Sequence, residues 1–473
     1  MIRRLDSDRS GYDLCIVGAG PAGLVIANEL ACAGLKICIL ESGGETRTAF
    51  ADALKTVESR KLQIKHGSRE RVIGGAGTVW GGLSAPLDPV DFEERPWCEG
   101  WPITLEHIEP FLVRAAQYRF PLPAEFKAER RAGWDMPGLR EKLFIAVRPP
   151  FDFARLRSVF ERSGIDLFLY ATAVRIMTEK TDRLATAAGI VCRSPEGKEF
   201  RVRSHAYVLA TGGIENSRLL LDSDIGNEND QVGRHFMNHP KGYAGRIVLS
   251  SSLPAGSPYL PRSVNGRILY AGLTLPQEEQ RSRGLLNSYV QFEPDLSVLQ
   301  RYAYGLWRRM PAWLNPLFNM LRPRIMRLRW YADMEPRAEN RILLSAQTDA
   351  HGRRVPAVSY ELGERDRETL RALHGRLRDE LRRLRVGILE GNVSDVILAA
   401  TEDASHHVGG TRMGRHARTS VVDADCRVHS VENLYVAGSS VFPTCGSANP
   451  TYTIVALAIR LAEHLSEVLK GAA

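Results

Sequence analysis

Cysteines are few in this chain and scattered along it. The seven cysteines stand at positions 15, 32, 38, 98, 192, 426 and 445, and no two form a Cys-x-x-Cys pair. This spacing predicts neither a zinc site nor a disulfide framework, and it is typical of a protein in a reducing cytoplasm. Cys15 and Cys38 fall within apolar runs, where a free thiol behaves as a small hydrophobic side chain.

Long apolar runs are also missing. No uninterrupted stretch reaches the ~20 residues that a membrane-spanning helix needs. Met1-Ile-Arg-Arg4 precedes an apolar stretch in the manner of a secretory signal, but that stretch is a strand and turn whose removal would destroy a nucleotide site. The 473 residues allow two or three domains, and 44% hydrophobic with 25% charged residues is ordinary for a globular protein. We therefore expect a cytoplasmic globular protein.

Residues 301–330 contain no acidic side chain. The segment has arginines at 301, 308, 309, 322, 324, 327 and 329, interleaved with Trp307, Trp313, Leu314, Leu317, Phe318, Met320, Met326 and Trp330. A basic and aromatic segment of this kind suits contact with a membrane surface, which would make the protein peripheral to a membrane. A lid or a subunit contact, with the arginines facing water, is the alternative. Because the net charge of +8 comes largely from this segment, nucleic acid is not an expected partner.

An apolar strand leads into a glycine-rich turn near the start of the chain. Residues 14–17 precede Gly18-Ala-Gly20-Pro-Ala-Gly23, and residues 24–35 have the apolar spacing of a helix. In this pattern the first glycine permits a tight turn, the second lets the backbone approach a pyrophosphate, and the third lets helix and strand pack closely. A second strand ends at Glu41, near the offset at which an acid binds ribose hydroxyls. The sequence therefore predicts a dinucleotide site.

Two further glycine clusters help to identify the dinucleotide. Residues 74–82 are rich in glycine but lack a flanking strand and helix, and the strand 207–210 ends in the turn Thr211-Gly212-Gly213. A chain that used NAD(P)H to reduce a flavin would be expected to have a second Gly-x-Gly-x-x-Gly motif between these landmarks. The sequence has none there, so FAD fits better than a nicotinamide.

With these motifs the chain resembles the glucose–methanol–choline (GMC) oxidoreductases over nearly its whole length. The matching stretches are Gly18 to Gly23 with Glu41, 74–82, Asp91-Phe92-Glu93, 100–103, 208–218, 232–240 and 406–458. The block 406–458 is the most specific of them. Within the family the chain is most similar to the sugar-oxidising branch, which includes pyranose 2-oxidases, glucoside 3-dehydrogenases and the flavin subunits of fructose dehydrogenases.

The resemblance implies an α/β fold, with a Rossmann-like FAD-binding domain and an α+β substrate domain on a mostly antiparallel sheet. The FAD-binding domain would take residues 1–95, 165–240 and 400–473, and the substrate-binding domain 96–164 and 241–399. In the latter, Leu370, Leu373, Leu377, Leu381 and Leu384 form the apolar stripe of a predicted amphipathic helix.

The resemblance also implies a set of cofactor-binding residues. They are Gly18, Gly20, Pro21, Ala22, Gly23, Glu41, Ser42, Gly75, Thr78, Trp80, Gly81, Gly82, Val174, Ala210, Thr211, Gly212, Gly438, Ser439, Asn449, Pro450 and Thr451. Some relatives attach FAD covalently through a histidine just before the tryptophan of the second glycine cluster. Val79 stands there in this chain, so we predict non-covalent FAD. His235 and His239 have i, i+4 spacing but no third ligand, and no metal site is predicted.

Oxidation of an alcohol requires a base for the hydroxyl proton, and histidine suits that task. A second polar group must hold the same oxygen so that the C–H bond points at flavin N5. The resemblance assigns these roles to a histidine in a His-x-x-Gly-Thr-x-Arg-Met-like motif and to Asn449. An alignment on Arg412-Met413-Gly414 makes the base His406, whereas an alignment on Gly410-Thr411 makes it His407. The Arg-Met anchor is longer and favours His406.

Asn449 also has a structural interpretation. Because Pro450 and an apolar helical pattern follow it, Asn449 is predicted to be a helix N-cap with proline at the first helical position. A helix that starts there would aim its positive end at the flavin and would stabilise negative charge on it.

The resemblance thus implies an FAD-dependent oxidoreductase that oxidises a CH–OH group to a carbonyl, with a small-molecule alcohol or sugar as its partner. The expected substrate is a secondary alcohol of a sugar, glycoside or cyclitol. One alternative is a lipid or polyketide alcohol oxidised at a membrane surface, and another is a flavin subunit that passes electrons to a cytochrome or quinone. The electron acceptor, whether oxygen, quinone or cytochrome, stays open.

Overall fold

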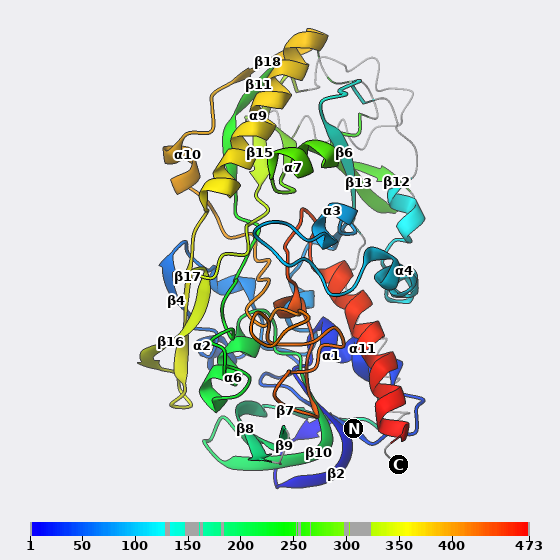
Figure 1. The fold of residues 1–473 in the computed structure, drawn as a ribbon, viewed down its shortest axis with the longest axis vertical. Helices are drawn as coiled ribbons and strands as arrows, with labels where there is room; N and C mark the ends of the chain where they lie inside the picture. The colour runs from blue at the N-terminus through cyan, green and yellow to red at the C-terminus, as the bar shows by residue number, and fades with distance from the viewer. Residues whose placement is uncertain are drawn as a thin grey trace.

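A computed structural model describes residues 2–127, 133–146, 160, 164–180, 184–251, 253, 257–264, 266–297, 302 and 323–471. The molecule is elongated, with one large sheet near each end and a smaller sheet between them at one side (Figure 1). Among the described residues, no helix combines the length and the apolar character that a membrane span requires.

The sheet near the two termini is largely parallel. Its strands are β1 (Ile2–Arg4), β2 (Arg9–Val17), β3 (Ile37–Leu40), β7 (Asp166–Leu169), β8 (Thr172–Lys180), β9 (Ala185–Arg193), β10 (Glu199–Leu209) and β19 (Leu434–Val436). They follow the order β1-β7-β3-β2-β10-β9-β8, with β19 also paired to β10. Only the β8–β9–β10 pairings are antiparallel. The last four residues of β2 and all of β3 are buried, as their apolar runs predict.

Two helices pack together beside this sheet. They are α1 (Pro21–Glu29) and α11 (Thr451–Gly471), and α4 (Leu105–Arg114) lies against α11 (Figure 1). The helix predicted over 24–35 begins earlier and ends earlier than expected. Pro21 is favourable in the first turn, and Gly34, at φ +78°, lies in the turn that returns the chain to β3.

The sheet at the far end is antiparallel throughout its described pairings. Its strands are β5 (Leu83–Ser84), β6 (Arg140–Ala146), β11 (Lys241–Leu249), β12 (Arg262–Val264), β13 (Arg267–Thr274), β14 (Tyr289–Pro294), β15 (Ile325–Tyr331) and β18 (Gly387–Glu390). They follow the order β18-β11-β15-β14-β13-β6-β5, with β12 paired to β13. A parallel sheet with packed helices and a separate antiparallel sheet confirm the predicted fold class.

The amphipathic helix predicted beside this sheet is α9 (Glu364–Leu384), which packs against β18. Leu370, Leu373, Leu377 and Leu381 are buried, so the predicted stripe is confirmed at these four positions. Leu384 is only partly buried because it is the last residue of the helix.

A three-stranded sheet of β16 (Arg341–Thr348), β17 (Arg354–Tyr360) and β4 (Glu58–Lys61) lies between the two larger sheets. β17 pairs in parallel with β4, so residues 341–360, expected in the substrate-binding domain, join a strand of the expected FAD-binding domain. The short helices are α2 (Ala49–Ala53), α3 (Pro89–Phe92), α6 (Glu215–Ser223), α7 (Gln277–Arg283) and α10 (Asp395–Ala399).

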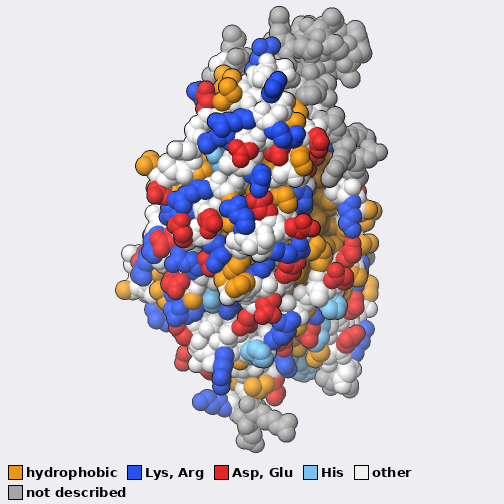
Figure 2. Space-filling view, turned by 45° about the horizontal axis from the view of Figure 1, so that its top comes forward, with side chains coloured by type: hydrophobic (Ala, Val, Ile, Leu, Met, Phe, Trp, Pro, Cys, Tyr) orange, Lys and Arg blue, Asp and Glu red, His pale blue; other side chains and the backbone are white. Residues whose placement is uncertain are grey.

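The arginine-rich segment 301–330 is described only at residue 302 and from residue 323 onward, and its other residues lie outside the described part. Within β15, Met326, Leu328 and Trp330 are buried, while Arg327 and Arg329 pair with Glu293 on β14. This end of the segment is thus a sheet strand. On the face in Figure 2, basic and acidic side chains are interspersed, so the net positive charge does not gather there. A membrane or subunit contact stays a prediction.

Candidate active site

A cavity of about 400 Å³ extends from the carboxyl ends of the parallel strands, within the size range of ligand sites. Its lining includes Gly18 after β2, Glu41 after β3, Ala210 after β10 and Gly438 after β19. In doubly wound folds, the carboxyl ends of the strands are where ligands bind. Many of the predicted cofactor-binding residues line it: Gly18, Gly20, Pro21, Ala22, Glu41, Ser42, Gly75, Trp80, Gly81, Ala210, Thr211, Gly212, Gly438, Ser439, Asn449, Pro450 and Thr451.

The glycines of the first motif differ in their surroundings. A Cβ on Gly18, at φ +108°, would lie 2.5 Å from the carbonyl oxygen of Ala210. A Cβ on Gly23 would lie 2.1 Å from the carbonyl oxygen of Gly18. Gly20 has no neighbour within 4 Å of such an atom, and it lines the cavity at the start of α1. Gly18 and Gly23 therefore allow close packing, and Gly20 leaves room for a bound group, as a dinucleotide requires.

Glu41 presents a buried carboxylate at the end of β3. Its oxygens accept hydrogen bonds from the backbone N–H groups of Ala19 at 2.9 Å and Gly43 at 2.8 Å. Burial raises the pKa of this carboxyl, against the lowering effect of the two N–H donors. The backbone N–H of Ser42 also acts on this carboxylate, which has about four acceptor sites, so some acceptor capacity stays available to hydroxyl groups in the cavity.

Four predicted cofactor-binding residues are absent from the described lining: Gly23, Thr78, Gly82 and Val174. Gly23 packs under the turn, and the Thr78 hydroxyl donates to the carbonyl of Gly75 at 2.9 Å. Residues 171–173 line the cavity in place of Val174, which is the next residue along β8. Val79, at the position where some relatives have a histidine, also lines it.

His406 and Asn449 come together on the cavity wall. The Asn449 amide Nδ2 lies 3.2 Å from His406 Nε2, and both residues line the cavity. His407 also lines the cavity, but its ring lies 5.9 Å from that of Phe236 and its Nε2 lies 3.5 Å from the Asp403 carboxylate. Of the two histidines that the sequence left open, the structure places His406 beside Asn449.

The N-cap prediction for Asn449 is wrong by one residue. Helix α11 begins at Thr451, and the carbonyl of Pro450 accepts the N–H of Ile454 at 2.9 Å. Pro450 therefore stands at the helix boundary. The Asn449 amide nitrogen contacts His406, and Asn449 lines the cavity.

His239 is a residue of this site that the sequence interpretation did not assign. Its Nδ1 lies 3.0 Å from His406 Nδ1, and its Nε2 lies 2.7 Å from the carbonyl oxygen of Gly446. His235, four residues earlier in the sequence, contacts the carbonyl of Pro336 at 2.7 Å instead. No group of three metal-ligating side chains occurs within the part of the chain that the structure describes. The stretch 232–240, already noted as a family match, was the available signal.

His239 and His406 are both buried, and burial determines their ionisation state. Burial lowers the pKa of His239 to about 4. Burial lowers the pKa of His406 well below its ordinary value, and a positive charge on His239 would lower it further. Both imidazoles are therefore neutral near pH 7, and a neutral imidazole has one ring nitrogen that can accept a proton.

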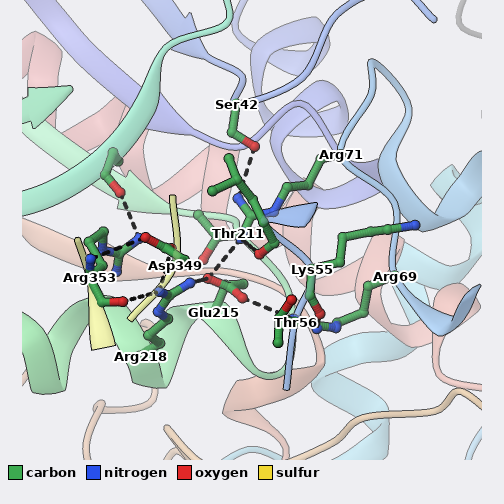
Figure 3. Close-up of polar contacts among 12 residues, drawn as sticks. Ser42, Lys55, Thr56, Arg69, Arg71, Thr211, Glu215, Arg218, Asp349 and Arg353 are labelled. Carbon is green, nitrogen blue, oxygen red and sulfur yellow. Dashed lines mark hydrogen bonds and ion pairs between the residues drawn. The ribbon is translucent and has the colours of Figure 1, made fainter. Parts of the chain in front are cut away.

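A cluster of paired charges forms another part of the cavity wall (Figure 3). The Glu215 carboxylate forms ion pairs with Arg69 at 2.9 Å, Arg71 at 3.1 Å and Arg218 at 3.3 Å. Burial alone would raise the pKa of Glu215, but the guanidiniums hold it well below its usual range. The sequence interpretation missed this cluster because its members lie far apart along the chain.

Further residues extend this cluster. Arg71 also donates to the Ser42 hydroxyl at 2.9 Å, and Arg218 pairs with Asp349 at 2.6 Å. Arg353 pairs with Asp222 at 3.2 Å and donates to the carbonyl of Ala173 at 3.1 Å. In Figure 3, Arg69 and Arg71 approach Glu215 from one side, and Arg218 approaches from the other. Ser42, just after β3, and Ala173, in β8, line the cavity, so the cluster supports the part of the wall beside these two strands.

Three family models match the sequence. A model described as an FAD binding domain matches residues 11–63, and two GMC oxidoreductase models match residues 148–241 and 336–458. The matched ranges contain the first glycine motif, His239, and both His406 and Asn449. FAD is therefore the cofactor that these residues fit.

Known proteins show the same relationship. The chain is 26% identical to the 6'''-hydroxyparomomycin C oxidase of Streptomyces lividus, over 96% of this chain and 92% of that protein. It is 27% identical to the fructose dehydrogenase large subunit of Gluconobacter japonicus, over 66% of this chain and 55% of that protein. The structure of Aspergillus oryzae RIB40 formate oxidase shares the fold, with a TM-score of 0.65 at 15% identity over 99% of this chain and 100% of that one. The chain is an oxidoreductase that belongs to the GMC oxidoreductase family, as its motifs indicated.

Proposed function

We propose that this enzyme oxidises a CH–OH group of a sugar or aminoglycoside to a carbonyl, with His406 as the base. The observation that carries the proposal is the contact of 3.2 Å between His406 Nε2 and the Asn449 amide on a cavity lined by the FAD motif. Relatives named for hydroxyparomomycin C and for fructose support a polyhydroxylated substrate. A secondary alcohol is the specific form that we propose.

Each residue of the pair has one task in this reaction. Neutral His406 accepts the hydroxyl proton of the alcohol at Nε2, the nitrogen that faces Asn449. The Asn449 amide donates a hydrogen bond to the alcohol oxygen and fixes the orientation of the carbinol carbon. Bound FAD supplies the acceptor for the hydride that leaves this carbon.

We propose that Gly20 and the start of α1 bind the FAD pyrophosphate and that Glu41 binds a ribose. Gly20 has free space around it, and Glu41 has unused acceptor capacity at the cavity wall. The other predicted cofactor-binding residues, with the domain boundaries 1–95, 165–240 and 400–473, belong to the same proposal.

We propose that FAD is bound without a covalent bond. The Val79 side chain, which lines the cavity, has no nucleophilic atom that could bond to the flavin. Acid precipitation of the holoprotein should therefore release the yellow chromophore into the supernatant. Flavin that stays with the precipitated protein contradicts this prediction.

Anaerobic stopped-flow reduction tests the function. The purified holoprotein is mixed with D-glucose, D-fructose, methyl β-D-glucoside, paromamine or 1-decanol, and loss of the flavin absorbance is followed. We expect at least one sugar to bleach the flavin faster than 1-decanol does. Bleaching by 1-decanol alone would support a lipid alcohol instead, and a colourless protein that does not take up FAD would overturn the proposal.

A second mixing step identifies the electron acceptor. The sugar-reduced enzyme is mixed with air-saturated buffer or with a soluble quinone, and recovery of the flavin absorbance is followed. Rapid recovery in air indicates an oxidase. Recovery with the quinone alone indicates a dehydrogenase, as in a flavin subunit that passes electrons onward.

A further inference from the structure

His239 forms a fixed link between the candidate base and the backbone. It is 2% exposed, lies just before β11, and its ring stands at 84° to that of His406 with 5.0 Å between the ring centroids. One of its nitrogens faces Gly446, three residues before Asn449, and the other faces His406. The first nitrogen, Nε2, also lies 3.3 Å from the Cys445 sulfur, whose thiol donates to the Asn238 carbonyl at 3.2 Å. No step of the proposed reaction has so far used this side chain.

The contacts of His239 determine which nitrogens carry protons. A carbonyl oxygen can only accept, so the contact of 2.7 Å with Gly446 requires His239 Nε2 to be the donor. In a neutral imidazole, the other nitrogen, Nδ1, then has no proton and must accept. His406 Nδ1, 3.0 Å away, is therefore the donor of the His239–His406 hydrogen bond. This leaves His406 Nε2 unprotonated beside Asn449.

We propose that His239 is a positioning residue for the reaction proposed above, and that it fixes His406 in the tautomer whose basic nitrogen, Nε2, faces the substrate. The inference rests on the proposed role of His406 as the base. When Nε2 takes the alcohol proton, the Nδ1–H bond of the resulting imidazolium keeps its acceptor on His239. The hydrogen bond strengthens because its donor is now charged. His239 thus orients the base before the reaction and stabilises it afterwards.

Other groups near His406 do not replace His239 in this task. Asp403 favours the protonated form of His406, whereas Lys241 and His407 oppose it. Asp403 is already engaged, because its oxygens accept from the Asn238 amide at 2.7 Å and from the backbone N–H of Lys65 at 2.9 Å. The ring of His407 lies against Phe236. Of the contacts described for His406 Nδ1, the one to His239 is the hydrogen bond that sets its proton.

Two substitutions of different chemistry test the inference. H239L removes the acceptor with a side chain of similar size, so His406 Nδ1–H has no partner. H239N keeps an acceptor, because its amide oxygen can stand near the former Nδ1 position. H235N is the matched control, since His235 is a nearby histidine on the same segment whose Nδ1 contacts only the Pro336 carbonyl. Asparagine also tolerates the positive φ of +58° at this position.

The first readout needs no substrate, and its decisive measurement is made on the wild-type holoprotein. Long-range ¹H–¹⁵N spectra of the histidine-labelled wild-type holoprotein, with His406 assigned by its loss in H406Q, report the tautomer directly. We expect His406 to be protonated at Nδ1 and unprotonated at Nε2 at pH 7. A wild-type His406 protonated at Nε2 overturns the inference. In H239L we expect a mixture of tautomers, whereas H239N and H235N should resemble the wild type.

The second readout is the rate at which a substrate reduces the flavin. The substrate is the one among D-glucose, D-fructose, methyl β-D-glucoside and paromamine that reduces the wild type fastest. We expect H239L to lower this rate about tenfold or more, with H239N and H235N within about threefold of the wild type. In H239L the acidic limb of the pH–rate profile should move to lower pH, because the His406 imidazolium has lost its acceptor. A purely structural role would not move this limb.

H406A separates the two proposals. If H406A loses flavin reduction while H239L keeps the wild-type rate and pH profile, only the role of His239 is wrong. If H406A still reduces its flavin at the wild-type rate, the proposed base is wrong and the inference falls with it.

Discussion

The cavity wall has two buried polar regions that are built on opposite principles. The direct side-chain partners of His406 are the neutral groups His239 and Asn449, each joined to it by a single hydrogen bond. Around Glu215 the groups are ionised, and one carboxylate meets three guanidiniums within 3.3 Å. Members of both regions line the same cavity.

The difference follows from the cost of burying charge. A buried ion is tolerated when opposite charges and hydrogen bonds surround it, which holds for Glu215 and its arginines. His406 has no carboxylate as a direct partner, so burial lowers its pKa and keeps it neutral. In one region the protein provides partners for the charge, and in the other it avoids the charge.

The comparison of the two regions indicates which of them can exchange a proton with a substrate. The oxygens of Glu215 are occupied by permanent cations, so this carboxylate is suited to hold the wall in shape. Among the described residues, the hydrogen-bond partner of His406 Nε2 is the neutral Asn449 amide at 3.2 Å, which a substrate hydroxyl can replace. We propose that the charged region is a frame, which keeps the cavity wall in shape, and that the neutral region takes part in the reaction.

H406A should have the largest effect on activity. Without the imidazole no group at this position accepts the alcohol proton, and flavin reduction should slow by about 10²- to 10⁴-fold. The yellow holoprotein should persist, because the charged region is untouched. Stopped-flow reduction and the visible spectrum measure the two properties. An H407Q variant that loses activity while H406A keeps it would assign the base to His407.

E215Q should have the largest effect on stability. Removing the charge leaves Arg69, Arg71 and Arg218 near a neutral amide, and breaking a buried pair of this kind costs about 3–5 kcal/mol. Chemical denaturation of the apoprotein measures the free energy of unfolding. E196Q is the control, because the Arg4–Glu196 pair is 63% and 56% exposed and should contribute about 1 kcal/mol or less. Equal losses of unfolding free energy in E215Q and E196Q would contradict a stabilising role for the charged region.

Acid should reduce the stability difference between the wild type and E215Q. The folded-state pKa of Glu215 is lowered, so its stabilising contribution is complete above the ordinary pKa of 4.5 and is lost as the pH falls below it. Melting temperatures at pH 7, 5, 4 and 3.5 should therefore converge below about pH 4.5. A difference that stays constant over this range would mean that the charge of Glu215 does not stabilise the fold.

The same comparison explains which features the sequence could predict. The strand–turn–helix around Gly18 and the leucine stripe of α9 are local patterns, and both occur in the structure. The resemblance to the GMC family led to His406 and Asn449, which contact each other in the structure. The end of α1 was misjudged because its apolar pattern continues past Glu29 into residues that form a turn.

Neither buried polar region could be assembled from the sequence. Glu215 meets arginines from residues 69 and 71, and His239 meets a histidine 167 residues away, so no local spacing records either contact. His239 was weighed with His235 as an i, i+4 pair, but the positive φ of +58° at His235 shows that this backbone is not helical. Pairings that depend on tertiary packing leave no periodic signal.

N449A should slow the reaction less than H406A does. The alcohol oxygen loses one donor but the base remains, so flavin reduction should fall about tenfold to a hundredfold through poorer orientation. His406 Nε2 also loses its only described amide partner, which should leave the melting temperature nearly unchanged. Stopped-flow reduction at several substrate concentrations separates the reduction rate from substrate affinity. A reduction rate equal to that of the wild type would remove Asn449 from the reactive region.

S42A should have the smallest effect and shows where the charged frame ends. Arg71 loses the Ser42 hydroxyl at 2.9 Å but keeps Glu215 and the Leu54 carbonyl, both at 3.1 Å. The free energy of unfolding should therefore fall by about 1 kcal/mol or less. Ser42 also lines the cavity, so FAD affinity, measured by titration of the apoprotein, should fall by about tenfold at most. A loss of unfolding free energy as large as that of E215Q would mean that Ser42 is itself an essential part of the charged region.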